Sequence, residues 1–347
     1  MRKMASVRKI TNLLPIEGAD AIELALVDGW QVVVKKDEFK VGELAIYFEI
    51  DSWVPNHIAP FLTKGKEPRE YNGVKGERLK TIKLRGQLSQ GLLLSCAILP
   101  YPVDVHGEGT DVSEILGVQK WEAEVAATQG GKAVSNWPSI IPKTDQERVQ
   151  NLRGVFESKI LTDVFEISEK LDGSSATYYI DSDGVFHAMS RNVDLERDEN
   201  NLWWKMSYKY DIENKLLSLW SNDRFKEAFN KGLCIRGEIV GPGVNSNKLK
   251  LQEHDFYVFD LYDPAKAEYC PSNERLAIVE NLGLKHVPVH KEYVRYSCTF
   301  EGLIEFADGK SQLNPEVKRE GIVLKSINDP NFTFKIVSND WLLEYKE

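Results

Sequence analysis

Short apolar runs separated by turn residues fill the first 120 residues of the chain. The runs are rich in β-branched and aromatic residues, a composition typical of strands. Turn sequences such as Gly18-Ala19-Asp20 separate them. Strands are expected at residues 29–34, 43–50, 79–84 and 91–95. Several short strands with little intervening helix predict a small β-barrel, and an OB-fold is a natural candidate at this size.

In the second half, strand patterns alternate with one long helical pattern. The helical pattern covers residues 199–229, where one face would be apolar through Trp203, Trp204, Leu216, Leu217, Trp220 and Phe225. Strands are expected at residues 164–168, 175–180, 185–190, 233–240, 255–262, 321–326 and 332–337. This order indicates an α+β fold of mainly antiparallel sheets with flanking helices.

Between the two halves the hydrophobic pattern weakens. Ala, Gly, Ser and Pro dominate there, with Gly130-Gly131 in the middle, as expected of a linker. The sequence therefore predicts a first domain at residues 1–125, a linker at 126–142 and a second domain at 143–347. Thr144 and Glu147 have the spacing of a capping box, which predicts a helix start there.

Composition agrees with two globular domains. The chain has 347 residues, with 44 Lys or Arg against 53 Asp or Glu and a net charge of −9. The acidic total argues against a surface that binds nucleic acid everywhere, but it allows a local basic groove. Residues 62–86 hold eight Lys or Arg against three Glu. This segment is either an ordinary charged loop or a surface that contacts a nucleic-acid backbone.

Four widely spaced cysteines argue against a disulfide scaffold or a structural zinc site: Cys96, Cys234, Cys270 and Cys298. The basic N-terminus has no apolar run after it, so a secretory signal is not expected. No apolar run is long enough for a spanning helix. We therefore expect an intracellular protein, cytoplasmic or nuclear, with no membrane partner.

Lys170-Leu171-Asp172-Gly173 is the most informative segment. Taken alone, it is also what a strand ending in an Asp-Gly turn looks like. Five further segments follow it in order: Ser190-Arg191-Asn192, Arg236-Gly237-Glu238-Ile239-Val240-Gly241, Phe256-Tyr257-Val258-Phe259-Asp260, Glu320-Gly321-Ile322-Val323-Leu324-Lys325 and Phe334-Lys335-Ile336-Val337-Ser338-Asn339.

Together these segments resemble the motifs of the covalent nucleotidyltransferases, namely polynucleotide ligases and mRNA capping enzymes. The resemblance implies that Lys170 attacks the α-phosphorus of a nucleotide and becomes a phosphoramide. An amine attacks only when unprotonated, and a free lysine has a pKa of about 10.4. We therefore expect desolvation and nearby cations to lower the pKa of Lys170; the candidate cations are Lys325, Lys335, Arg191 and a divalent metal.

The resemblance also implies roles for the other motif residues. Asp172, Glu238 and Glu320 would hold the metal, directly or through water, because Mg²⁺ keeps several waters. Lys325 and Lys335 would hold the α-phosphate, and Arg191 would place the phosphate or the RNA end. The expected nucleotide-binding residues are Glu169, Lys170, Arg191, Glu238, Phe259, Lys325 and Lys335. Glu169 would lie near the purine amine and Phe259 would stack on the base. Glu238 would contact the ribose if it does not hold the metal.

Considered singly, these residues have ordinary alternatives. Phe259 would more often be a core residue of its strand than a platform for a base. Glu238 and Glu320 would be solvated strand ends, and Lys325 and Lys335 exposed charges. Their functional interpretation depends on the shared pattern.

The position of the barrel distinguishes between the branches of the superfamily. DNA ligases and capping enzymes carry an OB domain after the last motif, whereas only residues 336–347 follow Lys335 here. The order resembles RNA ligases with an N-terminal OB domain, as do residues 15–20 and 142–151. Many RNA ligases have Lys-x-Lys in the last motif, and the single Lys335 leaves open which lysine matters more.

This branch implies an ATP-dependent RNA ligase that joins 3′-OH and 5′-phosphate ends in RNA repair or nick sealing. Its cofactors would be ATP and Mg²⁺ or Mn²⁺, and its partners RNA ends held partly by the OB-fold module; we expect a monomer. Lys170 would take AMP from ATP and pass it to the 5′-phosphate, after which the 3′-OH displaces AMP. The alternatives are an mRNA guanylyltransferase, a DNA ligase, or a catalytically inactive RNA-binding relative.

Overall fold

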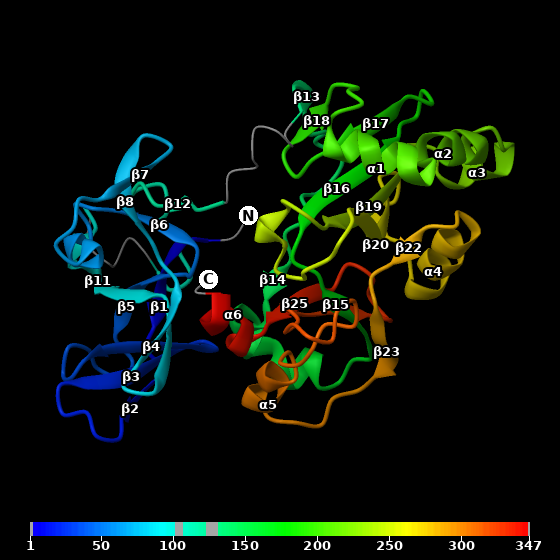
Figure 1. Ribbon diagram of the computed structural model, residues 1–347. Coiled ribbons are helices and arrows are strands. Elements are labelled where there is room, and N and C mark those ends of the chain that lie inside the picture. The colour runs from blue at the N-terminus through cyan, green and yellow to red at the C-terminus, as the bar shows by residue number, and fades with distance from the viewer. Residues whose placement is uncertain (1–2, 101–106, 123–130, 346–347) are drawn as a thin grey trace. The chain divides into compact units, whose positions relative to one another are not determined.

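The computed structural model describes residues 3–100, 107–122 and 131–345 (Figure 1). The chain forms two compact units. Unit 1 comprises Met1–Ala123, Glu147–Phe156 and Leu342–Glu347, and unit 2 comprises Glu124–Gln146 and Glu157–Trp341.

Unit 1 is built from short antiparallel strands. One sheet has the order β1 (Ala5–Lys9), β5 (Leu44–Phe48), β11 (Leu92–Ser95). A second has the order β2 (Asn12–Pro15), β3 (Ile22–Val27), β4 (Trp30–Lys35). A third has the order β12 (Gln119–Lys120), β6 (Ser52–Pro55), β8 (Val74–Arg78), β7 (Arg69–Tyr71), and β9 (Thr81–Leu84) pairs with β10 (Gln87–Gln90). The short 3₁₀ helices Pro60–Thr63 and Cys96–Ile98 complete the unit. All four strands that the apolar runs predict in this region are confirmed.

The segment Glu147–Phe156 follows the predicted linker in sequence but belongs to unit 1. The Trp30 indole donates to Asn151 Oδ1 at 2.7 Å, and the Gly29 amide donates to Gln150 O at 3.0 Å. The capped helix predicted here is wrong. The segment instead forms β14 (Glu147–Arg148) and a 3₁₀ helix (Val149–Val155), followed by a π-helical turn (Phe156–Ile160). Thr144 caps nothing, because its hydroxyl accepts a hydrogen bond from Ser175 at 3.1 Å.

The larger sheet of unit 2 is antiparallel along its main path. Its order is β13 (Ala133–Asn136), β18 (Val193–Leu195), β17 (Phe186–Met189), β16 (Ser174–Ile180), β19 (Leu233–Val240), β20 (Asp255–Asp263), β21 (Glu268–Tyr269). The short β22 (Lys285–His286) pairs with β20 in parallel. Part of the stretch predicted as linker is therefore the edge strand β13, which pairs with β18.

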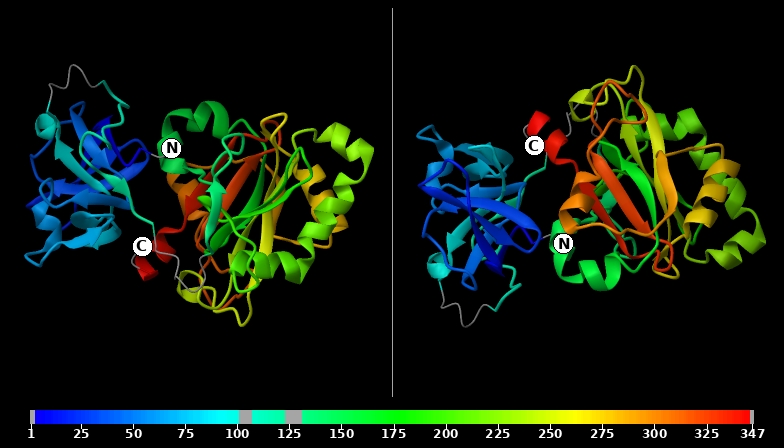
Figure 2. Two further views of the ribbon diagram at one scale, coloured as in Figure 1. Left: turned by 90° about the horizontal axis from the view of Figure 1, so that it is seen from above. Right: turned by 90° about the horizontal axis from the view of Figure 1, so that it is seen from below.

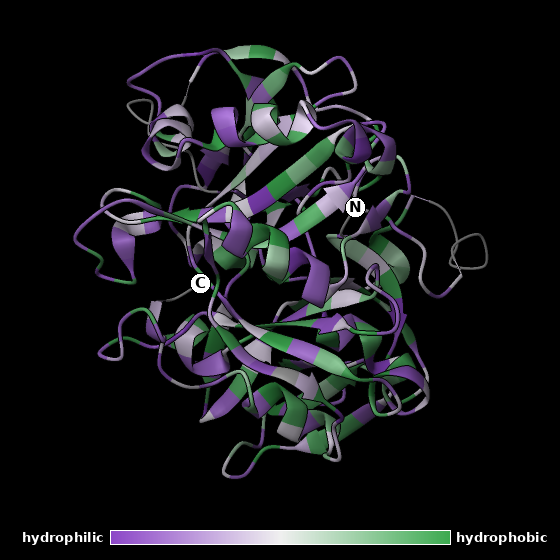
Figure 3. Ribbon diagram, turned by 90° about the vertical axis from the view of Figure 1, so that its right-hand side faces the viewer, coloured by the Kyte–Doolittle hydropathy of each residue, from purple (hydrophilic) through white to green (hydrophobic). Residues whose placement is uncertain are grey.

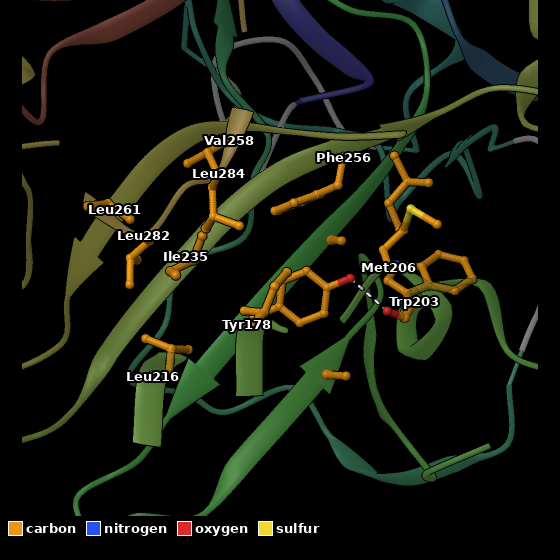
Figure 4. Packing of buried hydrophobic residues seen from close by; sticks show 14 of the residues in the cluster. Tyr178, Trp203, Met206, Leu216, Ile235, Phe256, Val258, Leu261, Leu282 and Leu284 are labelled. Carbon is orange, nitrogen blue, oxygen red and sulfur yellow. Dashed lines mark hydrogen bonds between the residues drawn. The ribbon is translucent and has the colours of Figure 1, made fainter. Parts of the chain in front are cut away.

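Helices cover one face of this sheet, on the side away from the second sheet in both views of Figure 2. They are α1 (Leu202–Tyr210), α2 (Ile212–Trp220), α3 (Asp223–Ala228) and α4 (Ser272–Asn281). Asn201 caps α1 by accepting a hydrogen bond from the Trp203 amide at 2.8 Å. The Tyr178 hydroxyl donates to Trp203 O at 2.7 Å within the core (Figure 4). Leu217 is 38% exposed, so its predicted place in the apolar face is wrong.

A second sheet of unit 2 has the order β25 (Thr333–Val337), β24 (Gly321–Ser326), β15 (Phe165–Lys170), β23 (Val289–Val294). The helices α5 (Phe300–Glu305) and α6 (Asn339–Tyr345) follow β23 and β25 in the chain. Apolar and polar positions alternate along many strands in Figure 3, whereas every residue of β24 is buried. The apolar patterns predicted neither β23 nor the helices α4 and α5.

The chain crosses from the second sheet to the larger one at Leu171-Asp172-Gly173, between β15 and β16. A Cβ at Gly173 would lie 2.3 Å from Ile239 O in β19, so only glycine fits this close approach. Every predicted strand of the second half has a counterpart, and the α+β class with an N-terminal barrel is confirmed. The crossover brings the lysine of the first motif to the junction of the two sheets.

Candidate active site

Lys170 and Glu320 lie at the junction as a close ion pair. Lys170 is the last residue of β15 and pairs with Gly321 at the start of β24, so Glu320 lies beside it. The two side chains meet at 2.6 Å between Lys170 Nζ and Glu320 Oε2. The Lys170 side chain is 23% exposed.

Three carboxylates determine the charge state of Lys170. Burial lowers the pKa of Lys170, but Glu320, Glu238 and Asp172 together raise it above its ordinary value. Of the expected causes of a lowered pKa, burial acts in the predicted direction, but the three carboxylates outweigh it. Burial raises the pKa of Glu238 to about 8, with Lys170 opposing and Glu320 adding to the rise. Burial likewise raises the pKa of Asp172 to about 6, with a further contribution from Glu320.

This excess of buried negative charge fits a hard divalent cation, which prefers oxygen ligands. Asp172, Glu238 and Glu320 are the predicted ligands, and all three act electrostatically on the same amine. Within the described parts of the chain, however, no three Asp, Glu, His or Cys side chains form a ready-made metal site. The arrangement therefore fits a metal held largely through water better than one enclosed by protein ligands.

Strand register places the three predicted lysines on one face of the second sheet. Lys170 pairs with Gly321, and Val323, two residues further along β24, pairs with Lys335. Directly opposed residues of antiparallel strands point to the same face, as do residues two apart on one strand. Lys325 is two residues beyond Val323, so all three lysines share this face.

Lys325 is buried and held by β20. Its ammonium donates to the Asp260 carboxylate and to Phe259 O. Burial lowers the pKa of Lys325 to about 8, although Asp260 opposes the shift. Lys325 therefore changes its protonation state at mildly alkaline pH. It is not the solvent-exposed charge that was its ordinary alternative.

Phe259 occupies a β-bulge of β20. Arg236 pairs with Asp260 while Gly237 pairs with Val258, which leaves Phe259 as the extra residue. Bulges often redirect a side chain beside an active site. The half-buried ring packs against a cluster that includes Leu171 from the crossover, and its centroid is 6.0 Å from Lys325 Nζ.

Glu169 and Arg191 are anchored differently. Glu169 is buried, and its Oε2 accepts the Gln312 amide at 2.7 Å. Burial raises the pKa of Glu169, while hydrogen bonds from Ser311 and Gln312 oppose the rise. Arg191 lies between β17 and β18 and contacts Asp145 Oδ1 at 2.5 Å. Its charge lowers the pKa of Glu238, which links it electrostatically to the carboxylates around Lys170.

Two residues that the sequence motifs do not include contact the predicted carboxylate of Asp172. Asn245 Nδ2 lies 3.2 Å from Asp172 Oδ1, and Lys248 Nζ lies 3.3 Å from Asp172 Oδ2. The only signal in the sequence is the run Gly241-Pro242-Gly243 followed by alternating asparagines, which indicates a turn but not its target.

The barrel unit, the two-sheet unit and a lysine surrounded by carboxylates are together the fold and site of a ligase. A family model described as an OB-fold domain matches residues 4–96, and one described as RNA ligase matches residues 163–337. The chain belongs to the RNA ligase family. A search of curated proteins gives no match.

Solved structures of a Naegleria gruberi RNA ligase are similar over the full chain. The structure with PPi has a TM-score of 0.89 and 40% identity, covering 100% of this chain and 99% of that one. A mutant with ATP and Mn has a TM-score of 0.88 and 39% identity, covering 99% of both chains. A mutant with AMP and Mn has a TM-score of 0.88 and 39% identity, covering 100% of this chain and 99% of that one. Among the described residues, no helix is long and apolar enough to cross a membrane.

Proposed function

We propose that this RNA ligase uses ATP and a divalent cation to join 3′-OH and 5′-phosphate RNA ends through a Lys170–AMP intermediate. The observation that carries the proposal is the Lys170 amine, 2.6 Å from Glu320 and within the field of three carboxylates. The similar Naegleria ligase has structures with ATP, AMP and Mn, which supports the same ligands here.

In the first step, Lys170 Nζ forms a bond to the α-phosphorus, and the bond from that phosphorus to the pyrophosphate oxygen breaks. Lys170 must first lose a proton. Asp172, Glu238 and Glu320 hold that proton on the amine in the metal-free protein, because each carboxylate raises the pKa of the lysine. The same carboxylates would hold Mg²⁺ or Mn²⁺, which supplies charge neutralisation at the phosphates and offsets their field on the amine.

Lys325 and Lys335 share the sheet face of Lys170, which supports the proposal that they bind the α-phosphate. Lys325 must then exchange the Asp260 carboxylate for a phosphate oxygen. Phe259 supplies an aromatic face for the base, and Glu169 an acceptor for the purine amine. Arg191, half-exposed beside Asp145, is suited to the phosphate of the incoming RNA end.

For the whole protein we propose residues 1–125 as the RNA-holding module, with contacts from the basic segment at residues 62–86. Residues 126–142 would connect the modules, although β13 within them belongs to the larger sheet. Residues 143–347 would carry adenylation, although Glu147–Phe156 packs with the first module. We further propose that the enzyme acts as an intracellular monomer in RNA repair or nick sealing.

Labelled nucleotide tests the first step. The wild-type protein, given α-labelled ATP and Mg²⁺ or Mn²⁺, should retain label on Lys170, and the Lys170→Ala variant should not. Label from GTP alone would contradict the ATP-dependent ligase, and a wild type as unlabelled as Lys170→Ala would support an inactive RNA binder. Sealing of nicks with RNA or DNA on either side then tests the substrate, with a 3′-OH and 5′-phosphate required at the joined ends.

A further inference from the structure

The turn at residues 241–251, after β19, reaches the carboxylate of Asp172 but has no part in the steps above. Three consecutive residues in it have left-handed backbone without being glycine: Asn245 at φ 41°, Ser246 at φ 61° and Asn247 at φ 47°. Such backbone costs free energy at each residue and persists only where the surroundings compensate. The contacts of the turn show what compensates.

Asn245 is hydrogen-bonded to two of the three crossover residues. Its Nδ2 donates to Gly173 O at 2.6 Å and to Asp172 Oδ1 at 3.2 Å. Its amide therefore holds the carboxylate and the adjoining backbone at once. The neighbouring Asn247 has the same backbone conformation, but its amide bonds to Leu251 O at 2.9 Å, within the turn.

Lys248 engages the other oxygen of the same carboxylate. Its Nζ lies 3.3 Å from Asp172 Oδ2 and 4.6 Å from the centroid of the Trp341 ring in α6. Lys248 is largely buried, with 15% of its side chain exposed. Each oxygen of Asp172 thus has a partner from the turn, and Asp172 is only two residues from Lys170.

On the basis of the proposed function, we propose that Asn245 and Lys248 are positioning residues for lysine adenylylation. They hold the Asp172 carboxylate and the Asp172-Gly173 backbone in the orientation that the reaction of Lys170 requires. Their effect passes through Asp172 rather than through contacts with ATP. Removing either side chain should therefore slow the chemical step more than it weakens the binding of ATP.

Glycine substitutions separate the amide of Asn245 from its backbone conformation. Asn245→Gly tolerates left-handed backbone and removes only the amide, and Asn247→Gly is the matched control. We expect the single-turnover rate of Lys170 adenylylation to fall about 10–100-fold in Asn245→Gly, as when a group that orients a ligand side chain is lost. The KM for ATP should change little, and Asn247→Gly should react like wild type.

Lysine variants provide a second, independent arm. Lys248→Met should slow adenylylation, Lys248→Arg should restore most of the rate, and Lys250→Met, at an exposed lysine of the same turn, should leave it unchanged. Thermal unfolding supplies a readout besides activity. If Lys248 acts on Asp172, the effects of Lys248→Met and Asp172→Asn on unfolding temperature should be non-additive.

The outcomes separate this inference from the proposed function. A wild type that ATP labels, together with Asn245→Gly and Lys248→Met variants that are labelled equally fast, would overturn the positioning role alone. A fall in rate matched by the same rise in KM for ATP would also overturn it, because it would indicate nucleotide contact. A wild type that ATP never labels would overturn the proposed function itself.

Discussion

Lys325 and Asp260 form a buried ion pair between β24 and β20, with only 5% and 6% of their side chains exposed. The same ammonium donates to Phe259 O, so the residue proposed to stack on the base and the residue proposed to bind phosphate are joined in one contact. An incoming nucleotide must compete with this carboxylate for the lysine. Nucleotide binding should therefore break an ion pair that joins two strands of unit 2.

Asp260→Asn should make ATP binding more sensitive to pH. The pKa of Lys325 is lowered to about 8 and Asp260 opposes that shift, so losing the carboxylate should lower the pKa further. A larger share of Lys325 is then neutral at alkaline pH and binds phosphate less well. The KM for ATP should rise more steeply between neutral and alkaline pH than in wild type. Identical pH profiles for Asp260→Asn and wild type would contradict the proposed phosphate contact. Lys325→Ala, which removes that contact altogether, should lower the rate of adenylylation about 100-fold.

Glu238→Gln should stabilise the metal-free protein while it abolishes adenylylation. The pKa of Glu238 is raised to about 8 in the folded protein, so folding favours its neutral form. A group whose pKa is raised by folding contributes its full stabilisation below its unfolded pKa. That stabilisation is lost as the pH rises through the pKa of the folded protein. At pH near 8 the variant should therefore unfold at least about 2–4 °C higher than wild type without metal.

The measurement for Glu238→Gln is thermal unfolding over a range of pH, with and without Mn²⁺. The stabilisation should shrink at acidic pH, where wild-type Glu238 is already neutral. A variant less stable than wild type at alkaline pH without metal would refute the explanation.

Gly173→Ala should disrupt the crossover. The added Cβ would lie 2.3 Å from Ile239 O and 2.8 Å from Glu238 Cγ, and the first contact is with backbone that cannot rotate away. Such overpacking costs about 1–3 kcal/mol of unfolding free energy. Gly154→Ala is the control, because nothing lies within 4 Å of its Cβ position. Denaturant unfolding and adenylylation should both suffer in the first variant and neither in the second.

Exposed cations of the basic segment should contribute to RNA binding rather than to the reaction with ATP. Lys83 and Arg85 lie at the end of β9 and in the turn to β10, both exposed. Replacing both with alanine should slow RNA sealing and reduce its dependence on salt, because fewer counterions are released on binding. Formation of the Lys170–AMP adduct should be unchanged. Lys36→Ala with Lys40→Ala removes two exposed cations of the same unit outside the segment, and equal loss in both pairs would argue against a specific RNA contact.

Periodicity predicted four strands of unit 1 and seven of unit 2, most of which have a buried face, but it missed others such as β1 and β3. It also missed β23, where charged residues such as Lys291 interrupt the apolar pattern at a sheet edge. The predicted helix start at Thr144 is wrong for a different reason. Side chains of this segment make tertiary contacts, so the local capping signal does not determine its conformation. Tertiary partners of this kind leave no periodic trace in the sequence.

The motif residues were found through the resemblance, but their surroundings were not. Register between β15, β24 and β25 explains why residues as distant as Lys170 and Lys335 share a face. The pairing of Lys325 with Asp260 and the hold of Asn245 on Asp172 depend on the bulge and the left-handed turn. Neither backbone irregularity follows from composition, and both determine charge and orientation at the site.

The placement of Glu147–Phe156 within unit 1 has a consequence for synthesis. Trp30 and Gly29 emerge from the ribosome more than a hundred residues before their partners Asn151 and Gln150. Domains generally fold as units during synthesis, N-terminal first. Here the N-terminal unit cannot close its packing until the linker and the start of the following segment have been made. The order of translation thus delays completion of the first unit beyond the synthesis of Lys170, because its last segment, Leu342–Glu347, is made at the end of the chain.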